Sequence, residues 1–535
     1  MRFANRIFTS SRSPIISRRG MVATSQPLAA QAGLAVLQAG GNAIDAAIAT
    51  VATLCVVEPC STGIGGDAFG LIWSADEGRL YGINASGPAP AAMEAGWLRK
   101  LGHNSFPTHG GLSVTVPGSL RGWELALSRF GSRGLDSLLS QAIDYAQNGY
   151  PVSPYIGRSW ARSTDLLSRL PDSRRVWLPS GRAPQVAEIF ANHEFATTLR
   201  TIADHGPDVF YRGSIGQQIV QSIRADGGVM AESDLANYQA EWVEPIAIDY
   251  LDGFTFHEIP PNGQGLTALI ALNLVKDMGL RHMEYGSADY YHLLIEAMKL
   301  AFADAETYIG DPRQADIPVE DLLSDRYTRQ RRSLIAPDRA LYPEPGRPGT
   351  HGDTVYLTVA DEAGNMVSWI QSLYMGFGSG LTAGKTGVQL QNRGANFSLQ
   401  PGHPNEVAPG KRPYHTIIPG FISRHRQPWS SFGVMGGFMQ PQGHLQVGVN
   451  LVDFEMDPQT ALDAPRFNWL RGREVALERV IGEKTRSDLA RRGHALLPAD
   501  ADVHYGGGQV IVRDPESGVL IGGSEPRNDG AAVGF

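Results

Sequence analysis

Thr354 stands at the border between two contrasting stretches of the sequence. Residues 337–352 are dense in proline and glycine, whereas residues 354–359 alternate as a strand does. A threonine hydroxyl is a weak nucleophile at neutral pH, but the α-amine of an N-terminal threonine, with an ordinary pKa of about 7.7–8.0, is a base within the same residue. That amine exists only if the chain is cut between Asp353 and Thr354. The border predicts such a nucleophile as one possibility, and a threonine that simply begins a strand would give the same pattern.

The paired glycines Gly436 and Gly437 form a second candidate for chemistry. They follow the apolar run 432–435 and precede a helical pattern over residues 440–451. Two glycines at a strand-to-helix turn allow two backbone N–H groups to converge on one point, as an oxyanion hole requires. An ordinary tight turn is the alternative interpretation of these residues.

Other polar residues admit both functional and structural interpretations. His292 and Glu296 lie four residues apart in a helical pattern, a spacing that places two metal ligands on one helix face. The sequence presents no third ligand nearby, so a partly buried histidine paired with a glutamate is the preferred interpretation. Arg393 and His415 lie at strand edges or in loops, where they face either a ligand or solvent. No metal, nucleotide or organic cofactor is expected.

The composition excludes several classes of protein. Of the 535 residues, 42% are hydrophobic and 19% are charged, which excludes a disordered chain. The net charge of −8, without a long basic run, argues against a nucleic-acid partner. Neither a membrane span of about 18 apolar residues nor the apolar segment of a secretory signal is found. The only cysteines, Cys55 and Cys60, cannot build a disulfide framework, and a cytoplasmic setting is expected.

The elements that must position these residues follow from periodicity and breakers. Helices are predicted over residues 28–38 and 42–56, and a β-hairpin over residues 68–73 and 80–85. The middle of the chain, residues 114–332, is mostly helical in pattern, with its clearest helix at residues 288–308. Strands are predicted over residues 354–359, 366–372, 387–391, 417–421 and 432–435. The pattern predicts an α+β fold in which sheets are flanked by helices.

These residues fall within motifs that resemble the γ-glutamyltransferase family of the N-terminal-nucleophile hydrolases. The resemblance extends in collinear order from Gly20 to Gly530. Its most specific motifs are residues 40–47 (GGNAIDAA), 63–67 (GIGGD), 116–118 (VPG), 296–304 (EAMKLAFAD), 352–354 (GDT), 409–413 (PGKRP) and 436–437 (GG).

The resemblance implies a fold and a maturation by self-cleavage. The fold is a four-layer αββα sandwich formed jointly by two autocleaved subunits, residues 1–353 and 354–535, which remain together as a heterodimer; further dimerisation is left open. Cleavage between Asp353 and Thr354 would release Thr354 as nucleophile and base. Gly436 and Gly437 match the oxyanion-hole pair of the family, and Ser372 stands where the family usually has a threonine that contacts the amine of the nucleophile.

The substrate-binding positions depart from the family pattern. Ser86 stands where glutamyl-processing members carry an arginine for the substrate carboxylate, and Tyr374 replaces an asparagine. Arg393 and Asn396 occupy the ends of a Gln-x-x-Asp motif that helps to hold the amino group. His415 and Thr416 replace a pair of serines. The charged residues that would bind a zwitterionic glutamyl group are therefore absent. Each buried charged contact that is lost is expected to weaken the binding free energy of that group by about 1.5–3 kcal/mol.

The replacing residues favour a different small-molecule amide. Arg393 and His415 add positive charge and Tyr374 fills volume, which predicts a smaller pocket for a short anion that arginine grips with two hydrogen bonds. A subgroup of the family resembles this description, namely the oxamate amidohydrolases of purine breakdown, which form oxalate and ammonia. The alternatives are a γ-glutamyl or glutathione hydrolase in which Arg393 holds the carboxylate, a β-lactam side-chain acylase, and an uncleaved binding module. Retention of Thr354, Ser372 and the glycine pair argues against the last.

Overall fold

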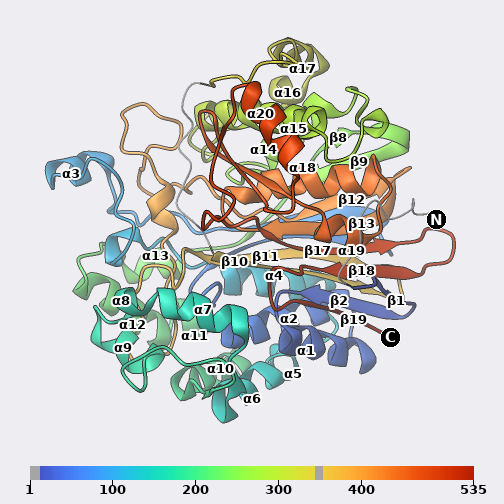
Figure 1. The fold of residues 1–535 in the computed structure, drawn as a ribbon. Coiled ribbons are helices and arrows are strands. Elements are labelled where there is room, and N and C mark those ends of the chain that lie inside the picture. Colours follow the sequence, from blue (N-terminus) through green and yellow to red (C-terminus); the bar gives the residue numbers. More distant parts are fainter. Residues whose placement is uncertain (1–11, 344–352) are drawn as a thin grey trace.

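Two β-sheets lie face to face in the centre of the protein, and helices cover their outer faces (Figure 1). The computed structural model describes residues 12–343 and 353–535. Each sheet has seven strands, and the mixed α/β architecture is the four-layer αββα sandwich that the resemblance implies. The inner faces of the sheets bury an apolar core that includes Phe69, Tyr356, Ile370 and Phe421. The fold class expected from the sequence is confirmed.

The sheet that carries Thr354 is built from both ends of the chain. Its strand order is β19-β2-β10-β11-β3-β4-β7. The strands are β19 (Ala531–Gly534), β2 (Gly20–Thr24), β10 (Asp353–Asp361), β11 (Met366–Tyr374), β3 (Asp67–Ser74), β4 (Arg79–Ala85) and β7 (Glu241–Val243). All are paired antiparallel, and the register places Ser372 opposite Asp67 on the neighbouring strand. The predicted hairpin and the two strands after Thr354 are confirmed.

The second sheet has the order β1-β18-β17-β13-β12-β9-β8. Its strands are β1 (Ile15–Ser17), β18 (Leu520–Ser524), β17 (Gly507–Arg513), β13 (Gln427–Met435), β12 (Gly420–Arg424), β9 (Phe254–Glu258) and β8 (Ile246–Asp249). Two of these, β8 and β9, lie in the stretch expected to be mostly helical. The strand predicted over residues 387–391 is wrong, because this segment makes only isolated bridges.

Helices packed on the two outer faces position the loops of the site. On the sheet of Thr354, α1 (Pro27–Gln38) packs against α2 (Ala43–Val57) so closely that a side chain at Gly33 would meet Thr50. A capping box of Asn42 and Asp45 begins α2. The other sheet is covered by α14 (Gly265–Val275), α15 (Ala288–Tyr308) and α18 (Met439–Val452).

The remaining elements surround this framework. Further helices are α3 (Ala95–Lys100), α4 (Ser119–Phe130), α5 (Leu135–Leu138), α6 (Ser140–Asn148), α7 (Pro154–Arg162), α8 (Thr164–Leu167), α9 (Pro171–Trp177), α10 (His193–His205), α11 (Asp208–Tyr211), α12 (Ser214–Ala225), α13 (Glu232–Ala236), α16 (Val319–Leu323), α17 (Asp325–Arg332), α19 (Pro458–Asp463) and α20 (Glu483–Arg491). Short 3₁₀ turns are η1 (Gly111–Ser113), η2 (Leu251–Gly253), η3 (Leu280–His282) and η4 (Arg393–Asn396). Two small sheets join β14 (Phe467–Arg471), β15 (Glu474–Leu477) and β16 (Ala495–Leu496), and β5 (Tyr150–Pro151) with β6 (Ile189–Phe190).

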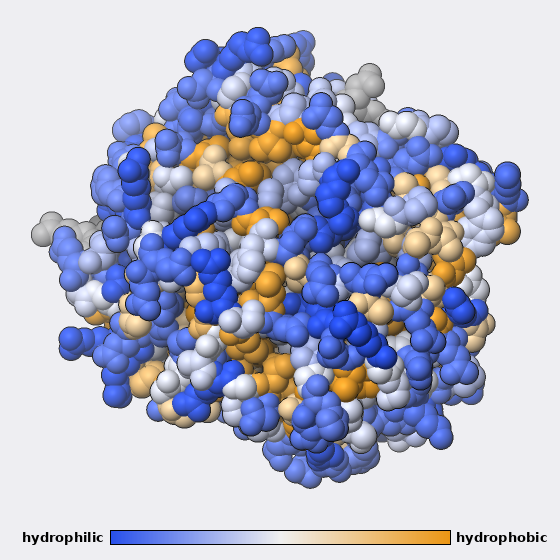
Figure 2. Space-filling model, turned by 180° about the vertical axis from the view of Figure 1, so that it is seen from behind, coloured by the Kyte–Doolittle hydropathy of each residue, from blue (hydrophilic) through white to orange (hydrophobic). Residues whose placement is uncertain are grey.

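The surface is mainly hydrophilic. On the face seen in Figure 2, apolar residues gather in a patch in the upper half and in smaller patches below it. Within residues 12–343 and 353–535, no helix has the length and apolar character needed to cross a membrane. The proline- and glycine-rich connector expected before Thr354 falls largely on residues 344–352, which lie outside the described residues, as do residues 1–11.

Candidate active site

Thr354 is the second residue of β10 and is buried, with 2% of its surface exposed. Its Oγ1 donates a hydrogen bond to Oγ of Ser372 over 3.1 Å. The same Oγ accepts a hydrogen bond from the backbone N–H of Tyr374 over 2.7 Å. Strand pairing of β10 with β11 brings these residues together, because Asp353 lies opposite Tyr374 in the register. The sheet therefore fixes the hydroxyl of Thr354 beside the retained hydroxyl of Ser372.

Gly436 and Gly437 form the turn between β13 and α18, as the sequence predicts. Their φ angles are 127° and 59°, in the region that favours glycine. A Cβ on Gly436 would lie 2.9 Å from Nδ1 of His504, so a side chain does not fit there. The carbonyl of Gly437 accepts a hydrogen bond from Nε2 of Gln264 over 2.9 Å, which anchors the turn to the start of α14.

Arg393 is a fully buried cation close to the end of β11. The backbone N–H of Asn392 donates to the carbonyl of Leu373 over 3.2 Å, and this bond holds the start of η4 beside the strand. The guanidinium lies 4.4 Å above the ring of Tyr374, and its Nη1 donates to Oγ1 of Thr416 over 2.6 Å. Among the described residues, its Nε and Nη2 have no hydrogen-bond partner. Burial lowers the pKa of Arg393 to about 10, so the group stays charged at neutral pH.

Asp67 is a buried carboxyl that the motif analysis quoted only as the end of GIGGD. Its Oδ1 accepts hydrogen bonds from the backbone N–H groups of Gly87 and Gly118, at 3.0 and 3.2 Å, and from Nε2 of Gln391 at 2.9 Å. Its Oδ2 lies 3.1 Å from Nε2 of His415. Burial raises the pKa of Asp67 to about 7, although Arg393 opposes this shift. The lone acid after a glycine run was the available signal for this residue.

His415 does not add positive charge to the site, and that prediction is wrong. Its ring is fully buried, with its edge against Phe69, and Nε2 points to Asp67. Burial lowers the pKa of His415 well below its usual range, and Arg393 lowers it further. The imidazole is therefore neutral and serves to orient the Asp67 carboxyl.

Ser86 lies outside the cavity near Tyr374, whereas Asn396 lines it. Ser86 is buried, and its hydroxyl donates to Oδ1 of Asn84 over 2.7 Å and accepts from Nδ2 of Asn262 over 3.2 Å. Ser86 does not line the cavity of about 260 Å³ that lies near Tyr374 and Phe438. Asn396 does line that cavity, and its Nδ2 donates to the carbonyl of Tyr414 over 3.0 Å.

A cavity of about 260 Å³ is lined by Tyr374, two residues after Ser372, and by Phe438, which directly follows Gly437. Aromatic and polar side chains share its walls. The aromatic residues include Phe302, Tyr374, Tyr414, Phe438 and Trp469. Its volume exceeds the 150 Å³ or so of an engineered cavity that holds benzene. Arg393 is not among the residues that line this cavity, so the smaller pocket expected around Arg393 and Tyr374 stays a prediction.

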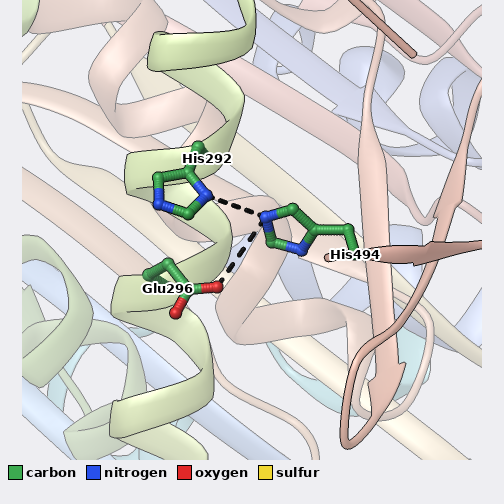
Figure 3. A group of neighbouring side chains, drawn as sticks. All are labelled: His292, Glu296 and His494. Carbon is green, nitrogen blue, oxygen red and sulfur yellow. Dashed lines mark hydrogen bonds and ion pairs between the residues drawn. The ribbon is translucent and has the colours of Figure 1, made fainter. Parts of the chain in front are cut away.

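A second polar cluster lies away from this site, on α15. Figure 3 shows His292 and Glu296 on one face of α15, with His494 approaching from a segment far beyond Thr354 in the chain. One potential ligand atom of each residue lies within 4.8 Å of the others. Nδ1 of His292 is 2.8 Å from Nε2 of His494, which lies 3.8 Å from Oε1 of Glu296. The sequence presents no third ligand near this pair, and that prediction is wrong because His494 lies beside them in the fold.

The other contacts of the cluster identify it as a polar network that holds the chain together. Nζ of Lys299 donates to the same Oε1 of Glu296 over 2.7 Å, where it opposes a cation. Nε2 of His292 donates to the carbonyl of Ala336 over 2.7 Å, and the N–H of Leu341 donates to Oε2 of Glu296 over 2.8 Å. The network therefore fastens residues 336–341 to α15, as an ion-paired structural cluster would.

Comparison with known proteins identifies the family of the chain. The family profile described as gamma-glutamyltranspeptidase matches residues 29–535. A glutathione hydrolase-like proenzyme of Bacillus subtilis, YwrD, is 38% identical over 97% of this chain and 99% of its own length. An oxamate amidohydrolase proenzyme of Klebsiella pneumoniae is 35% identical over 97% of this chain and 99% of its own length.

A solved structure agrees with these relatives. The crystal structure of a cephalosporin acylase from Bacillus halodurans is 47% identical in sequence and superimposes with a TM-score of 0.92. The match covers 99% of this chain and 98% of the acylase chain. The fold is thus shared with this acylase over nearly the whole chain.

Proposed function

The chain belongs to the gamma-glutamyltranspeptidase family, and from this premise we propose that it is an autoprocessing N-terminal-threonine amidohydrolase acting on the amide of a short anionic acid, with oxamate as the simplest substrate. Membership of the family makes it an amide-bond hydrolase of the N-terminal-nucleophile type. The residue roles, the processing and the acid are the proposed part. The mature enzyme would be a heterodimer of residues 1–353 and 354–535.

Processing would use the residue that later performs catalysis. The hydroxyl of Thr354 attacks the carbonyl of Asp353, and the peptide bond is exchanged for an ester as the nitrogen leaves with a proton. Water then hydrolyses the ester, which frees the Asp353 carboxyl group, the Thr354 hydroxyl and a new α-amine. The hydrogen bond from Thr354 to Ser372 supports this step because it fixes the attacking oxygen.

Turnover would follow the same chemistry on the substrate. The Thr354 hydroxyl attacks the amide carbonyl while its proton passes to the α-amine, and the N–H groups of Gly436 and Gly437 stabilise the negative oxygen. The amine passes the proton to the leaving nitrogen, so that ammonia departs and an ester remains. Water, deprotonated by the same amine, hydrolyses the ester and restores Thr354. No cofactor enters these steps.

Arg393 supplies the observation that carries the choice of an anionic acid. A buried guanidinium with two unpaired donor nitrogens is costly unless a partner satisfies it. A carboxylate matches the fork of Nε and Nη2 in geometry and in charge. Because Arg393 contacts Tyr374, whose N–H bonds to Ser372, a carboxylate held there would lie close to the reacting threonine.

A γ-glutamyl amide is the second candidate, supported by the similarity to the glutathione hydrolase-like protein of B. subtilis. In that case Arg393 would hold the α-carboxylate. Ser86 and Asn396 offer no charge for the glutamyl group, and the Ser86 hydroxyl already bonds to Asn84 and Asn262. These contacts favour the smaller acid.

Purified enzyme tests both parts of the proposal. A denaturing gel of wild type should give two bands, and Thr354→Ala should give a single full-length band, because it lacks the attacking hydroxyl. Steady-state kcat/KM is then compared for oxamate and γ-glutamyl-p-nitroanilide. Preference for the glutamyl substrate would overturn the anionic-acid assignment, and an uncleaved wild type would overturn the mechanism.

A further inference from the structure

The aromatic cavity beside the nucleophile has no role in holding a short anion. We propose that it receives the leaving amine, and that the preferred substrates are amides of a short anionic acid with a flat apolar amine, such as an N-aryl oxamate. This inference rests on the proposed function and extends it to the other side of the scissile bond. Its basis is the position of the cavity, the arrangement of its rings and the pairing of its polar groups.

The position of the cavity follows from the chain neighbours of the reacting groups. Tyr374 lines it and lies two residues after Ser372, which accepts the hydrogen bond of Thr354. Phe438 also lines it and directly follows Gly437. Tyr414, on the same wall, donates through its hydroxyl to Oε1 of Gln264. Nε2 of the same glutamine donates to the carbonyl of Gly437. The cavity thus adjoins both the nucleophile and the glycine turn.

The rings of Phe302, Tyr414, Phe438 and Trp469 pack against one another along one wall of the cavity. Tyr414 stacks on Phe438, with centroids 5.9 Å apart and planes 20° apart. Phe302 of α15 contacts Phe438 at 6.3 Å and Trp469 at 5.5 Å. A wall of packed rings offers the apolar surface on which an aryl ring can stack or pack edge to face. The volume of about 260 Å³ accommodates such a ring with a substituent.

Two polar residues on the aromatic side of the cavity, Gln442 and Asn396, are engaged with the protein. Nε2 of Gln442 donates to the carbonyl of Trp469, and its Oε1 accepts from the backbone N–H of the same residue. Asn396 donates to the carbonyl of Tyr414. This side of the cavity therefore offers mainly apolar contact, which suits an aryl amine better than ammonia. The lining also includes the carboxyl-bearing Glu306, and this negative charge favours an amine over a second acid.

Arg393 would bind the carboxylate of the substrate, and the cavity would bind its leaving amine. The guanidinium lies over the ring of Tyr374 but is not part of the cavity lining, so the anion site and the apolar site meet at this tyrosine. A substrate with its carboxylate on Arg393 and its amine in the cavity would place the amide between them. The cavity would then bury the leaving group while Thr354 attacks the carbonyl.

The test compares four amides with the processed enzyme: oxamate, N-phenyloxamate, phenylacetamide and acetanilide. N-Phenyloxamate should have the highest kcat/KM, exceeding oxamate by about tenfold or more. Aniline leaves more readily than ammonia without any help from a cavity, so a variant must supply the decisive readout. Ala305→Leu fills the cavity from α15 and should lower the N-phenyloxamate to oxamate ratio by about tenfold. Ala303→Leu, on the same helix but outside the lining, should leave the ratio unchanged.

The outcomes separate this inference from the proposed function. A higher kcat/KM for oxamate than for N-phenyloxamate, or a ratio that Ala305→Leu does not move, would overturn the inference and leave the anionic acid in place. Phenylacetamide as best substrate, with sensitivity to Ala305→Leu, would assign the cavity to the acyl group and also overturn it. Hydrolysis of acetanilide alone, sensitive to Ala305→Leu, would retain the leaving-amine site and refute the anionic acid. A processed enzyme inactive on all four would refute both.

Discussion

Arg393 is the residue on which recognition of the acid depends. Its guanidinium is buried, positively charged at neutral pH and only partly paired. The Asp67 carboxyl, raised to a pKa of about 7 by burial, is a weak counter-charge in the acidic range. Below about pH 7, an anion that enters the site therefore meets a cation with little counter-charge, and above it the anion competes with the ionised Asp67.

Arg393→Gln should raise KM for oxamate by about ten- to a hundredfold, because a charge-assisted contact of about 1.5–3 kcal/mol is lost. Arg393→Lys should recover part of this, since it keeps the charge but not the paired donors. In wild type, KM should rise as the pH passes about 10, where the guanidinium loses its proton. Steady-state kinetics from pH 7 to 11 measure both effects. Arg158→Gln, at an exposed arginine of α7, is the control. A fall in kcat at constant KM would contradict the assignment.

At the scale of elements, α15 joins the two parts of the chain through its buried polar face. His292, Glu296 and Lys299 hold residues 336–341, and His494 reaches the same cluster from beyond Thr354. Burial, reinforced by the Lys299 and His292 charges, lowers the pKa of His494 to about 3. The network is therefore stable only while His494 is neutral.

The stability of the protein should consequently fall as the pH decreases from about 6.5 towards 3. In this window the unfolded chain protonates His494 while the folded chain does not, so the free energy of unfolding declines by up to about 1.4 kcal/mol per pH unit from this group. His494→Gln should be less stable at pH 7 but should lose less stability on acidification. Thermal midpoints at several pH values test this, with exposed His205→Gln as control. Parallel pH profiles for wild type and His494→Gln would contradict it, and a wild-type midpoint lowered by EDTA would indicate a bound metal instead.

Local sequence patterns were sufficient to predict some helices and strands but not others. The capping box at Asn42 and the strands on either side of residues 361–366 form from signals contained in a few neighbouring residues. Residues 387–391 have a strand pattern, but the side chains of Gln389 and Gln391 bond to Trp177 and Asp67 instead of entering a ladder. Strand β9 has a clear alternation of buried and half-buried residues, which the surrounding helical pattern obscured.

In the whole molecule, the two proposed subunits share one sheet. Strands β10 and β11 follow the cleavage point, yet they lie between β2 and β3, which precede it. Strand β19, from the end of the chain, borders the other edge of β2. Separation of residues 1–353 from residues 354–535 would therefore expose the ladders and the core on both sides.

The processed enzyme should accordingly elute as one species that contains both fragments, near the 57.7 kDa of the full chain if the pair does not associate further. Denaturant should separate the fragments in a single cooperative transition, because they have no independent cores. Size-exclusion chromatography with gel analysis of the peak, together with urea titration, measures this. Thr354→Ala provides the covalent reference. Fragments that elute apart under native conditions would contradict the interleaved arrangement.

The sequence by itself indicated the family through its motifs, and the resemblance implied the four-layer fold and the roles of Thr354, Ser372 and the glycine pair. Hydrophobic periodicity along short stretches predicted only an α+β fold with sheets flanked by helices. Only the tertiary structure decided what surrounds them. Whether His415 is charged depends on burial against Phe69 and Arg393, and the third member of the α15 cluster comes from a segment far along the chain. The aromatic cavity likewise joins Phe302 of α15 to Phe438 and Trp469. Burial, pairing and cavity shape are sums over residues distant in sequence, so no local pattern contains them.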